Sequence, residues 1–210
     1  MPDLRAIIDP HHTAVVTMEM ERGVVGDLAT IEELAKVVRQ SGTIDAVSRL
    51  VHAARPAGAR VVHCVAEWRA DRLGTALNTP LLRSLAKDSR QILQGTPAVE
   101  LVSGLGPEPS DLVSRRSHGL TPFTGTDLDS LLRNAGVTTV IATGVSLNVG
   151  VVGLCLSAAD LGYQVVVPTD AVAGTPQHYG AEVLHHTIGM VASLTTSEEI
   201  IDTWTRAAQS

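Results

Sequence analysis

The stretch Val137–Gly174, VTTVIATGVSLNVGVVGLCLSAADLGYQVVVPTDAVAG, constrains the fold more than any other part of the sequence. It contains two short runs rich in β-branched apolar residues, Thr138–Thr143 and Gln164–Pro168, which are typical of strands buried on both faces. The residues between them predict a helix of about four turns. A strand, a helix and a second strand in this order form a right-handed βαβ unit with parallel strands. The stretch therefore predicts a parallel sheet covered by helices.

The start of this helix, Ser146–Val151, is the first candidate for a ligand site. Unpaired backbone N–H groups and the positive end of the helix dipole lie there, at the carboxyl ends of the strands. Ligands of open α/β sheets bind at that edge. The amides near Val149 and Gly150 are therefore expected to hold an oxyanion or a carboxylate.

The rest of the sequence alternates strand and helix patterns. The other strand candidates are Ala14–Glu19, Arg60–Ala66, Asp111–Arg115 and Val191–Leu194. Three patterns resemble capping boxes that open helices: Thr30-x-x-Glu33, Thr126-x-x-Asp129 and Thr196-x-x-Glu199. These elements predict a three-layer α/β/α sandwich of the Rossmann-like kind with a six-stranded, mostly parallel sheet. We find no linker, so we expect residues 1–210 to form one domain.

Composition argues against several kinds of binding partner and indicates where the protein is located. The 16 Lys and Arg residues against 22 Asp and Glu residues give a net charge of −6, which argues against nucleic acid or an anionic membrane as partner. The two cysteines, Cys64 and Cys155, lie in predicted core elements and do not indicate a disulfide framework. Neither a secretory signal nor an apolar run of about 18 residues is visible, so we expect a soluble, cytoplasmic protein.

Three segments carry a resemblance to a known family. Gly144-Val145, Gly150 and Tyr163 follow the spacing of a G-V-x-x-x-x-C segment and the G-Y-x-V after it. Phe123-x-Gly125-Thr126-Asp127-Leu128 is similar to S-A-F-x-G-T-D-L, and the strand ending Glu19-Met20-Glu21 is similar to one ending D-M-Q. The order and amino-acid sequences of these segments resemble those of the isochorismatase-like hydrolases, also called the cysteine hydrolase family. The resemblance implies the strand order 3-2-1-4-5-6.

The three positions at which this family carries Asp, Lys and Cys hold Glu19, Ser117 and Gly150 here. A glycine at the third position resembles isochorismatases proper, which cleave a vinyl ether with a carboxylic acid and need no thiol. It argues against a thioester intermediate, and so against nicotinamidase or carbamoylase activity by the usual covalent route. Cys155 cannot replace the missing thiol, because five helical residues rotate it by roughly 140° from Gly150. We expect Cys155 to be a packed core residue.

Glu19 is the best candidate for a general acid or base. It ends a buried strand at the carboxyl edge of the sheet, where desolvation would raise its pKa toward neutrality. The alternative is a structural carboxylate paired with Arg22 or another arginine. Ser117 has no charge with which to replace the family's lysine, but the neighbouring Arg116 or His118 could reach the same space. His118 could also move protons near neutral pH, or be a plain loop histidine.

Other residues are candidates for substrate binding. Ser146 and Asn148 could cap the helix or point polar groups into a pocket. The resemblance also implies a cis peptide at Val145-Ser146. Trp68, Leu120 and Phe123 could form an apolar pocket wall. His63 lies either near the pocket or in the core as a hydrogen-bonded histidine.

The sequence does not predict a metal or a cofactor. The D-x-H-x-x-H pattern of metal-using relatives is missing after His63. The adjacent pairs His11-His12 and His185-His186 point in different directions and cannot chelate as an i, i+4 pair would. Neither the dinucleotide-binding nor the P-loop glycine pattern is present.

Three functions remain open from the sequence. The first is an isochorismatase-like hydrolase in which Glu19 protonates a small carboxylated substrate or activates a water against it. The second is a hydrolase of another small amide or ester, with direct attack by water. The third is a non-catalytic relative that binds a small molecule or serves as an assembly module. The resemblance also implies a homodimer or homotetramer.

Overall fold

Six strands form the sheet that the β-branched runs predict. The computed structural model describes residues 3–88 and 92–209; residues 1–2, 89–91 and 210, which the single-domain prediction also spans, lie outside the described residues. The strands are β1 (Thr13–Met18), β2 (Arg60–Ala66), β3 (Leu112–Arg116), β4 (Thr139–Gly144), β5 (Gln164–Pro168) and β6 (Ser193–Thr195). Their order is β3-β2-β1-β4-β5-β6 and all five pairings are parallel. The predicted fold class and strand order are confirmed.

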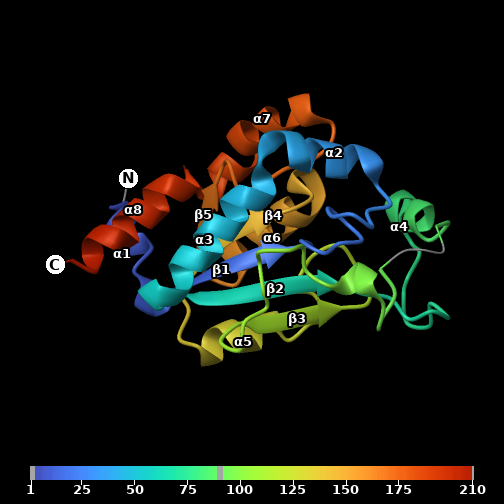
Figure 1. Ribbon diagram of the computed structural model, residues 1–210, viewed down its shortest axis with the longest axis horizontal. Coiled ribbons are helices and arrows are strands. Elements are labelled where there is room, and N and C mark those ends of the chain that lie inside the picture. The colour runs from blue at the N-terminus through green and yellow to red at the C-terminus, as the bar shows by residue number, and fades with distance from the viewer. Residues whose placement is uncertain (1–2, 89–91, 210) are drawn as a thin grey trace.

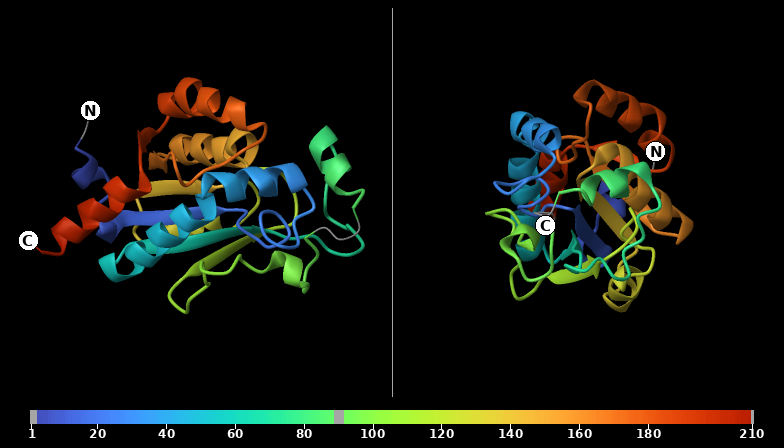
Figure 2. Two further views of the ribbon diagram at one scale, coloured as in Figure 1. Left: turned by 45° about the horizontal axis from the view of Figure 1, so that its top comes forward. Right: turned by 90° about the vertical axis from the view of Figure 1, so that its right-hand side faces the viewer.

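Helices cover both faces of this sheet (Figures 1 and 2). They are α1 (Leu4–Ile7), α2 (Glu32–Ser41), α3 (Thr43–Ala57), α4 (Pro80–Leu85), α5 (Leu128–Asn134), α6 (Val152–Asp160), α7 (Gln177–His186) and α8 (Ser197–Ala207). No helix in the described ranges is long and apolar enough to cross a membrane.

The alternation of side chains along the strands divides the core into two layers. Val15, Val61 and Ile141 belong to the cluster that contains the buried residues of α2, α3 and α8. Val16 and Ala142 belong to the cluster that contains those of α5, α6 and α7. The continuous apolar runs of the sequence therefore reflect burial on both sides of the sheet, as in other parallel sheets.

Local structure differs from the sequence predictions at several element ends. The cap predicted at Thr196 is a full capping box with Glu199. Helix α2 begins after Ile31, and α5 begins after Asp127, with the Thr126 hydroxyl accepting from the Leu128 amide at 3.3 Å. The helix after β4 opens with a π-helical turn, Leu147–Val151, and becomes α-helical only from Val152. The peptide Val145-Ser146 is cis, as the resemblance implied.

All six strands point their carboxyl ends toward the same edge of the sheet. In Figure 1 the arrowheads of β2 and β3 point to the side where α4 lies, while both chain ends lie at the opposite side. Gly144 ends β4 at this edge with φ 98°, and a Cβ atom there would lie 2.2 Å from the carbonyl oxygen of Met18. Only glycine lets β4 approach the end of β1 so closely.

Candidate active site

A cavity of about 190 Å³ lies at the carboxyl edge of the sheet. Its polar groups come from the strand ends and the loops after them: Glu19, Arg116, Ser146, Asn148 and Thr175. Its apolar side chains come mainly from α2, α4 and the loops beside them: Val24, Ile31, Leu34, Trp68, Leu81, Leu82, Leu85, Ile92 and Leu120. We call the second group the apolar wall. Among the described residues that line the cavity, charge is confined to Glu19 and Arg116.

Glu19 occupies a backbone conformation that glutamate rarely adopts. Strand β1 ends at Met18, one residue earlier than predicted, and Glu19 follows with φ 51°. Its amide still donates to the carbonyl of Cys64 on β2, with an N–O distance of 3.0 Å. A left-handed conformation costs a non-glycine residue about 1 kcal/mol or more, and such strain gathers at functional sites. The backbone thus turns the carboxylate of Glu19 out of the strand and into the cavity.

The partner of Glu19 is Arg116, at the end of β3. The guanidinium of Arg116 donates to the Glu19 carboxylate, and their side chains are only 8% and 19% exposed. Burial lowers the pKa of Arg116 to about 10, so it stays protonated at neutral pH. The sequence alternative, a carboxylate paired with Arg22 or another arginine, is thus met by Arg116, while Arg22 binds Asp27 and Glu100 at the surface. The pair therefore lies inside the pocket and both of its charges face the ligand space.

Arg115 and Arg116 show how strand alternation decides which arginine reaches the pocket. Successive strand residues point to opposite faces. Arg115 pairs with Glu67 at 2.7 Å and its side chain is 52% exposed. Arg116 therefore supplies the positive charge one position before Ser117, where the sequence has none.

Gly150, the position at which the sequence resemblance implies the family's cysteine, lines the cavity. A Cβ atom on Gly150 would lie 2.9 Å from Cε of Met18 and 3.0 Å from the carbonyl oxygen of Val145. A side chain at Gly150 would therefore require the terminal methyl group of Met18 to move and the carbonyl of Val145 to shift slightly. The Val149 amide, one of the two expected to hold an oxyanion, already donates to the carbonyl of Ser146 at 3.0 Å.

Ser146 and Asn148 line the cavity and also stabilise its loop. The Ser146 hydroxyl donates to Oδ1 of Asn148 at 2.7 Å, and Nδ2 of Asn148 donates to the carbonyl of Thr175 at 3.2 Å. Neither side chain caps the helix. The two polar groups are thus held in place by one another and by the loop after β5.

Three residues named as site candidates lie outside the cavity lining. Ser117 contributes its carbonyl oxygen to the Thr75 hydroxyl, at 2.8 Å. The ring of His118 lies over Gly125, where a Cβ atom would approach its Cε1 to 2.7 Å. Phe123 is buried against Tyr163, with ring centroids 6.0 Å apart. Gly119 and Leu120 of the same segment do line the cavity, so sequence proximity to Arg116 alone does not decide which side chains reach the site.

The two other apolar candidates, Trp68 and Leu120, do line the cavity. His63 does not. It is fully buried, with Nδ1 2.8 Å from the Thr17 hydroxyl and Nε2 3.4 Å from Asp111. Desolvation lowers the pKa of His63, so the ring is neutral and belongs to the core.

Sequence reasoning did not single out Glu21, two residues after Glu19. Its side chain is fully buried, Oε1 accepts from the Ala66 amide at 2.6 Å, and Oε2 has no partner among the described residues. Burial raises the pKa of Glu21 to about 8. The available signal was the D-M-Q motif, in which an uncharged glutamine stands where this chain has Glu21.

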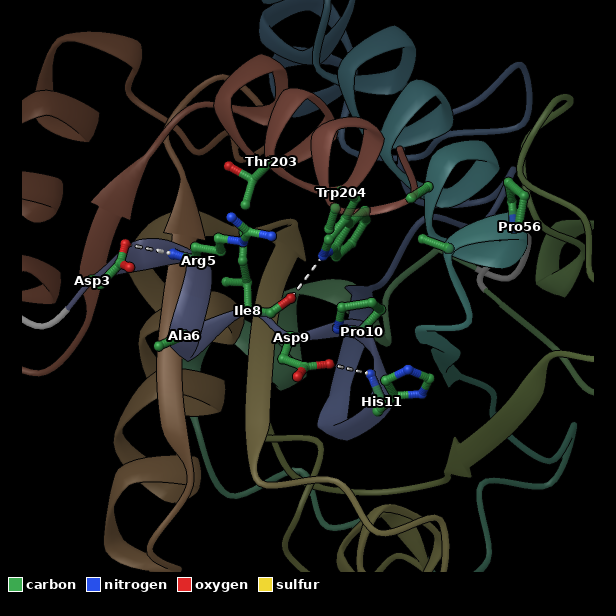
Figure 3. Close-up of a pocket in the computed structure, with 13 residues that line it drawn as sticks. Asp3, Arg5, Ala6, Ile8, Asp9, Pro10, His11, Pro56, Thr203 and Trp204 are labelled. Atoms are coloured by element: carbon green, nitrogen blue, oxygen red, sulfur yellow. Dashed lines mark hydrogen bonds between the residues drawn. The ribbon is translucent and has the colours of Figure 1, made fainter. Parts of the chain in front are cut away.

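A second, larger cavity lies at the other end of the molecule. It measures about 530 Å³ and is formed by the N-terminal segment, the end of α3 and α8. Figure 3 shows Arg5, Thr203 and Trp204 around it, with Nε1 of Trp204 donating to the Ile8 carbonyl. This cavity lies beside the amino ends of the strands, where α/β sheets do not bind their substrates. Size alone therefore does not identify the active site.

The described residues contain no cluster of three or more His, Cys, Asp or Glu side chains that could hold a metal ion. Cys64 and Cys155 are both buried and free. Burial raises the pKa of Cys155 to about 12 and raises that of Cys64 as well. Both thiols are therefore protonated at neutral pH, and neither lines the cavity beside Gly150.

Comparison with known proteins agrees with the resemblance seen in the sequence. The family model described as "Isochorismatase domain" matches residues 13–199. This chain therefore belongs to the isochorismatase family. It is a hydrolase of that family, and its fold is the family's six-stranded α/β fold.

Individual relatives and solved structures match most of this chain. YecD, an isochorismatase family protein of Escherichia coli O157:H7, is 28% identical over 192 residues, covering 90% of this chain and 95% of YecD. The ureidoacrylate amidohydrolase RutB of Methylorubrum extorquens is 30% identical, covering 80% of this chain and 73% of RutB. The crystal structure of an isochorismatase family protein from Desulfovibrio vulgaris superposes with a TM-score of 0.77 at 25% identity, covering 92% and 98% of the two chains.

Proposed function

We propose that this isochorismatase-family hydrolase cleaves a small, carboxylated metabolite without a thiol, by general acid–base chemistry at Glu19. The observation that carries the proposal is the ion pair of Glu19 with Arg116, held in the cavity that Gly150 also lines. An adjacent guanidinium favours the carboxylate form of a side chain, which is the form that accepts a proton from water. Glu19 therefore acts first as a base.

In this mechanism Glu19 takes a proton from a water molecule as the water oxygen forms a bond to the electrophilic carbon of the substrate. The bond from that carbon to the leaving atom breaks, and the proton passes from Glu19 to the leaving group. Arg116 stabilises negative charge that develops near Glu19, or binds the carboxylate of the substrate. The amide of Gly150 is our candidate for an oxyanion donor, because the Val149 amide is already used by Ser146.

The crowding around Gly150 supports a mechanism without a thiol. A cysteine there would place its Cβ against Met18 and the carbonyl of Val145, at distances that require both to shift. Atoms in a close-packed interior resist such shifts. We infer that the site is built around glycine and that water attacks the substrate directly.

Two alternatives differ in what is bound and whether it reacts. The relative that is a ureidoacrylate amidohydrolase favours an amide or ureido substrate over an ether, with direct attack by water. The ion pair is also compatible with a binding module, because Arg116 already pairs with the carboxylate of Glu19. A binding module would take up a small molecule and leave it unchanged.

Separate replacement of each of the two neighbouring arginines, Arg116 and Arg115, by glutamine tests the proposal. We would measure hydrolysis of isochorismate, small amides and carbamates by the wild type and by the Arg116→Gln and Arg115→Gln variants. Removing a charge that stabilises the transition state should lower kcat/KM by about a hundredfold in Arg116→Gln. Arg115→Gln, which removes an exposed charge from the same strand, should change kcat/KM little.

Three outcomes would decide between the readings. Equal losses in the two variants would contradict a specific role for Arg116. Full activity of Arg116→Gln would overturn the proposed use of the pair. Binding of panel members without turnover would favour the binding module.

A further inference from the structure

The apolar wall is large compared with the polar part of the same cavity. Two helices that are remote in sequence contribute most of it: α2 and the residue before it through Leu34 and Ile31, and α4 through Leu81, Leu82 and Leu85. A site for a wholly polar metabolite would not need so much aliphatic surface, because each buried polar group requires a hydrogen-bonding partner. The wall therefore faces a part of the ligand that is itself apolar.

Trp68 is fixed in this wall from two sides. The guanidinium of Arg72 lies 4.2 Å from the centre of the indole ring. The backbone of Trp68 also accepts from the Gln94 amide at 2.9 Å and donates to the Ile92 carbonyl at 2.8 Å. The indole is thus held before any ligand arrives, which lowers the entropy cost of binding.

The volume of the cavity limits the size of the ligand. Engineered apolar cavities of about 150 Å³ bind benzene, whereas sites for drug-sized ligands measure roughly 300–1,000 Å³. At about 190 Å³ the cavity has room for a small hydrocarbon group beside the atoms that react. A long chain or a fused ring system would not fit.

We propose that the substrate of this enzyme carries a short branched or cyclic hydrocarbon group, which packs against the apolar wall while its polar end faces Glu19 and Arg116. The part of this proposal that concerns the reacting, polar end of the substrate rests on the proposed function. The part that concerns its hydrocarbon group rests on the apolar wall alone. Specificity then comes from Leu81 and its neighbours, and the chemistry comes from the strand ends.

A series of N-carbamoyl amino acids with side chains growing from hydrogen to isobutyl tests the assignment. Every member has the same carboxylate and the same ureido group, so only the apolar group changes. Burying one methylene group improves binding by about fourfold. We expect kcat/KM to rise by about that factor per methylene up to the leucine derivative and to fall for larger side chains. The glycine derivative as the best substrate would overturn the proposal.

Leu81 and Leu77 provide a matched pair of variants. Their side chains are similarly exposed, 39% and 38%, but Leu81 lines the cavity and Leu77 does not. Leu81→Asn should flatten the rise of kcat/KM along the series, and Leu77→Asn should leave the rise unchanged. Both variants remove partly exposed leucines, so a loss of folding would affect both. An unchanged rise in Leu81→Asn would contradict the proposed wall.

A binding measurement separates this proposal from the proposed function. Trp68 lines the cavity, whereas Trp204 lies in α8, so Trp204→Phe leaves one fluorescent reporter at the site. Carboxylates from acetate to 3-methylbutanoate, which carries the same isobutyl group as the leucine derivative, are the probes. We expect Kd from Trp68 fluorescence to fall with chain length even if nothing is hydrolysed, and in that case only the proposed function fails. A Kd independent of chain length would overturn the apolar assignment, whatever the activity.

Discussion

Glu19 and Glu21 lie two residues apart after β1, yet the structure gives them opposite surroundings. Glu19 reaches a cavity, adopts a left-handed backbone and pairs with Arg116. Glu21 is sealed from solvent, accepts one amide hydrogen bond from Ala66 and leaves Oε2 without a partner among the described residues. The two residues thus carry the same functional group, but their carboxyl groups differ in burial and in hydrogen-bonding and charge partners.

This difference shows that the role of a carboxyl group is determined by its burial and its charge partners and cannot be read from the residue type. A nearby guanidinium favours a carboxylate, while burial without a counter-ion favours the protonated acid. Enzymes that use two carboxyl groups separate their roles in this way. We therefore expect Glu19 to affect activity and Glu21 to affect stability.

The largest expected effect on stability concerns the pH dependence caused by Glu21. In the unfolded chain this carboxyl ionises above its ordinary pKa of 4.5, whereas the native protein keeps the proton until about 8. Between these two values the native state binds more protons than the unfolded state. The contribution of Glu21 to the free energy of unfolding is therefore fully present below pH 4.5 and is lost as pH rises to 8. The loss should be about 1 kcal/mol per pH unit, several kcal/mol in total.

Thermal unfolding of wild type and Glu21→Gln from pH 5 to 8 measures this loss. The glutamine keeps an acceptor for the Ala66 amide and cannot ionise. We expect a smaller decrease of Tm with pH in Glu21→Gln than in the wild type. Parallel Tm curves would show that Glu21 is ionised in the native protein, and the contrast with Glu19 would then be lost.

A smaller effect is expected from filling the space at Gly150. Gly150→Ala should destabilise the protein by about 1–3 kcal/mol, because its Cβ meets Met18 and the Val145 carbonyl. Gly180→Ala is the control, since a Cβ at that position in α7 makes only an ordinary contact of 3.4 Å with Leu147. Alanine should be neutral or stabilising there. Equal stability of Gly150→Ala and wild type in a urea titration would show that the site has room for a side chain.

The smallest effect is expected from the cysteines. Cys64→Ala and Cys155→Ala should leave kcat/KM of the folded protein nearly unchanged, because both thiols are buried and protonated. Steady-state assays at low temperature, with circular dichroism to confirm folding, measure this. Loss of activity in a folded Cys155→Ala protein would restore a thiol to the mechanism.

The sequence predicts the sheet well because the evidence for each strand is local. Runs such as Thr138–Thr143 are apolar, β-branched and bounded by turn residues, and burial on both faces leaves few other folds for them. The capping box at Thr196 is local in the same sense. The caps predicted at the other two helices differ in detail: α2 begins after Ile31 and α5 after Asp127, and at α5 the Thr126 hydroxyl accepts from the Leu128 amide at 3.3 Å.

The site is less predictable because its contacts join distant parts of the chain. Glu19 could be named from its position after a strand, but its partner depends on which of two arginines points inward at the end of β3. His118 and Phe123 are close to Arg116 in sequence, yet their side chains lie outside the cavity that Leu120, between them, lines. The apolar wall brings together α2, α4 and the loop of Trp68, and no local pattern shows that they meet.

The central claim is that Glu19 performs hydrolysis without a thiol, and the same substitution at both glutamates tests it most directly. We would measure kcat/KM at pH 7 for wild type, Glu19→Gln and Glu21→Gln on the substrate that the wild type hydrolyses best. The account predicts that Glu19→Gln loses activity by about a hundredfold or more, as expected for a general acid–base group, while Glu21→Gln keeps it. Activity retained in Glu19→Gln, or lost equally in both variants, would contradict the account.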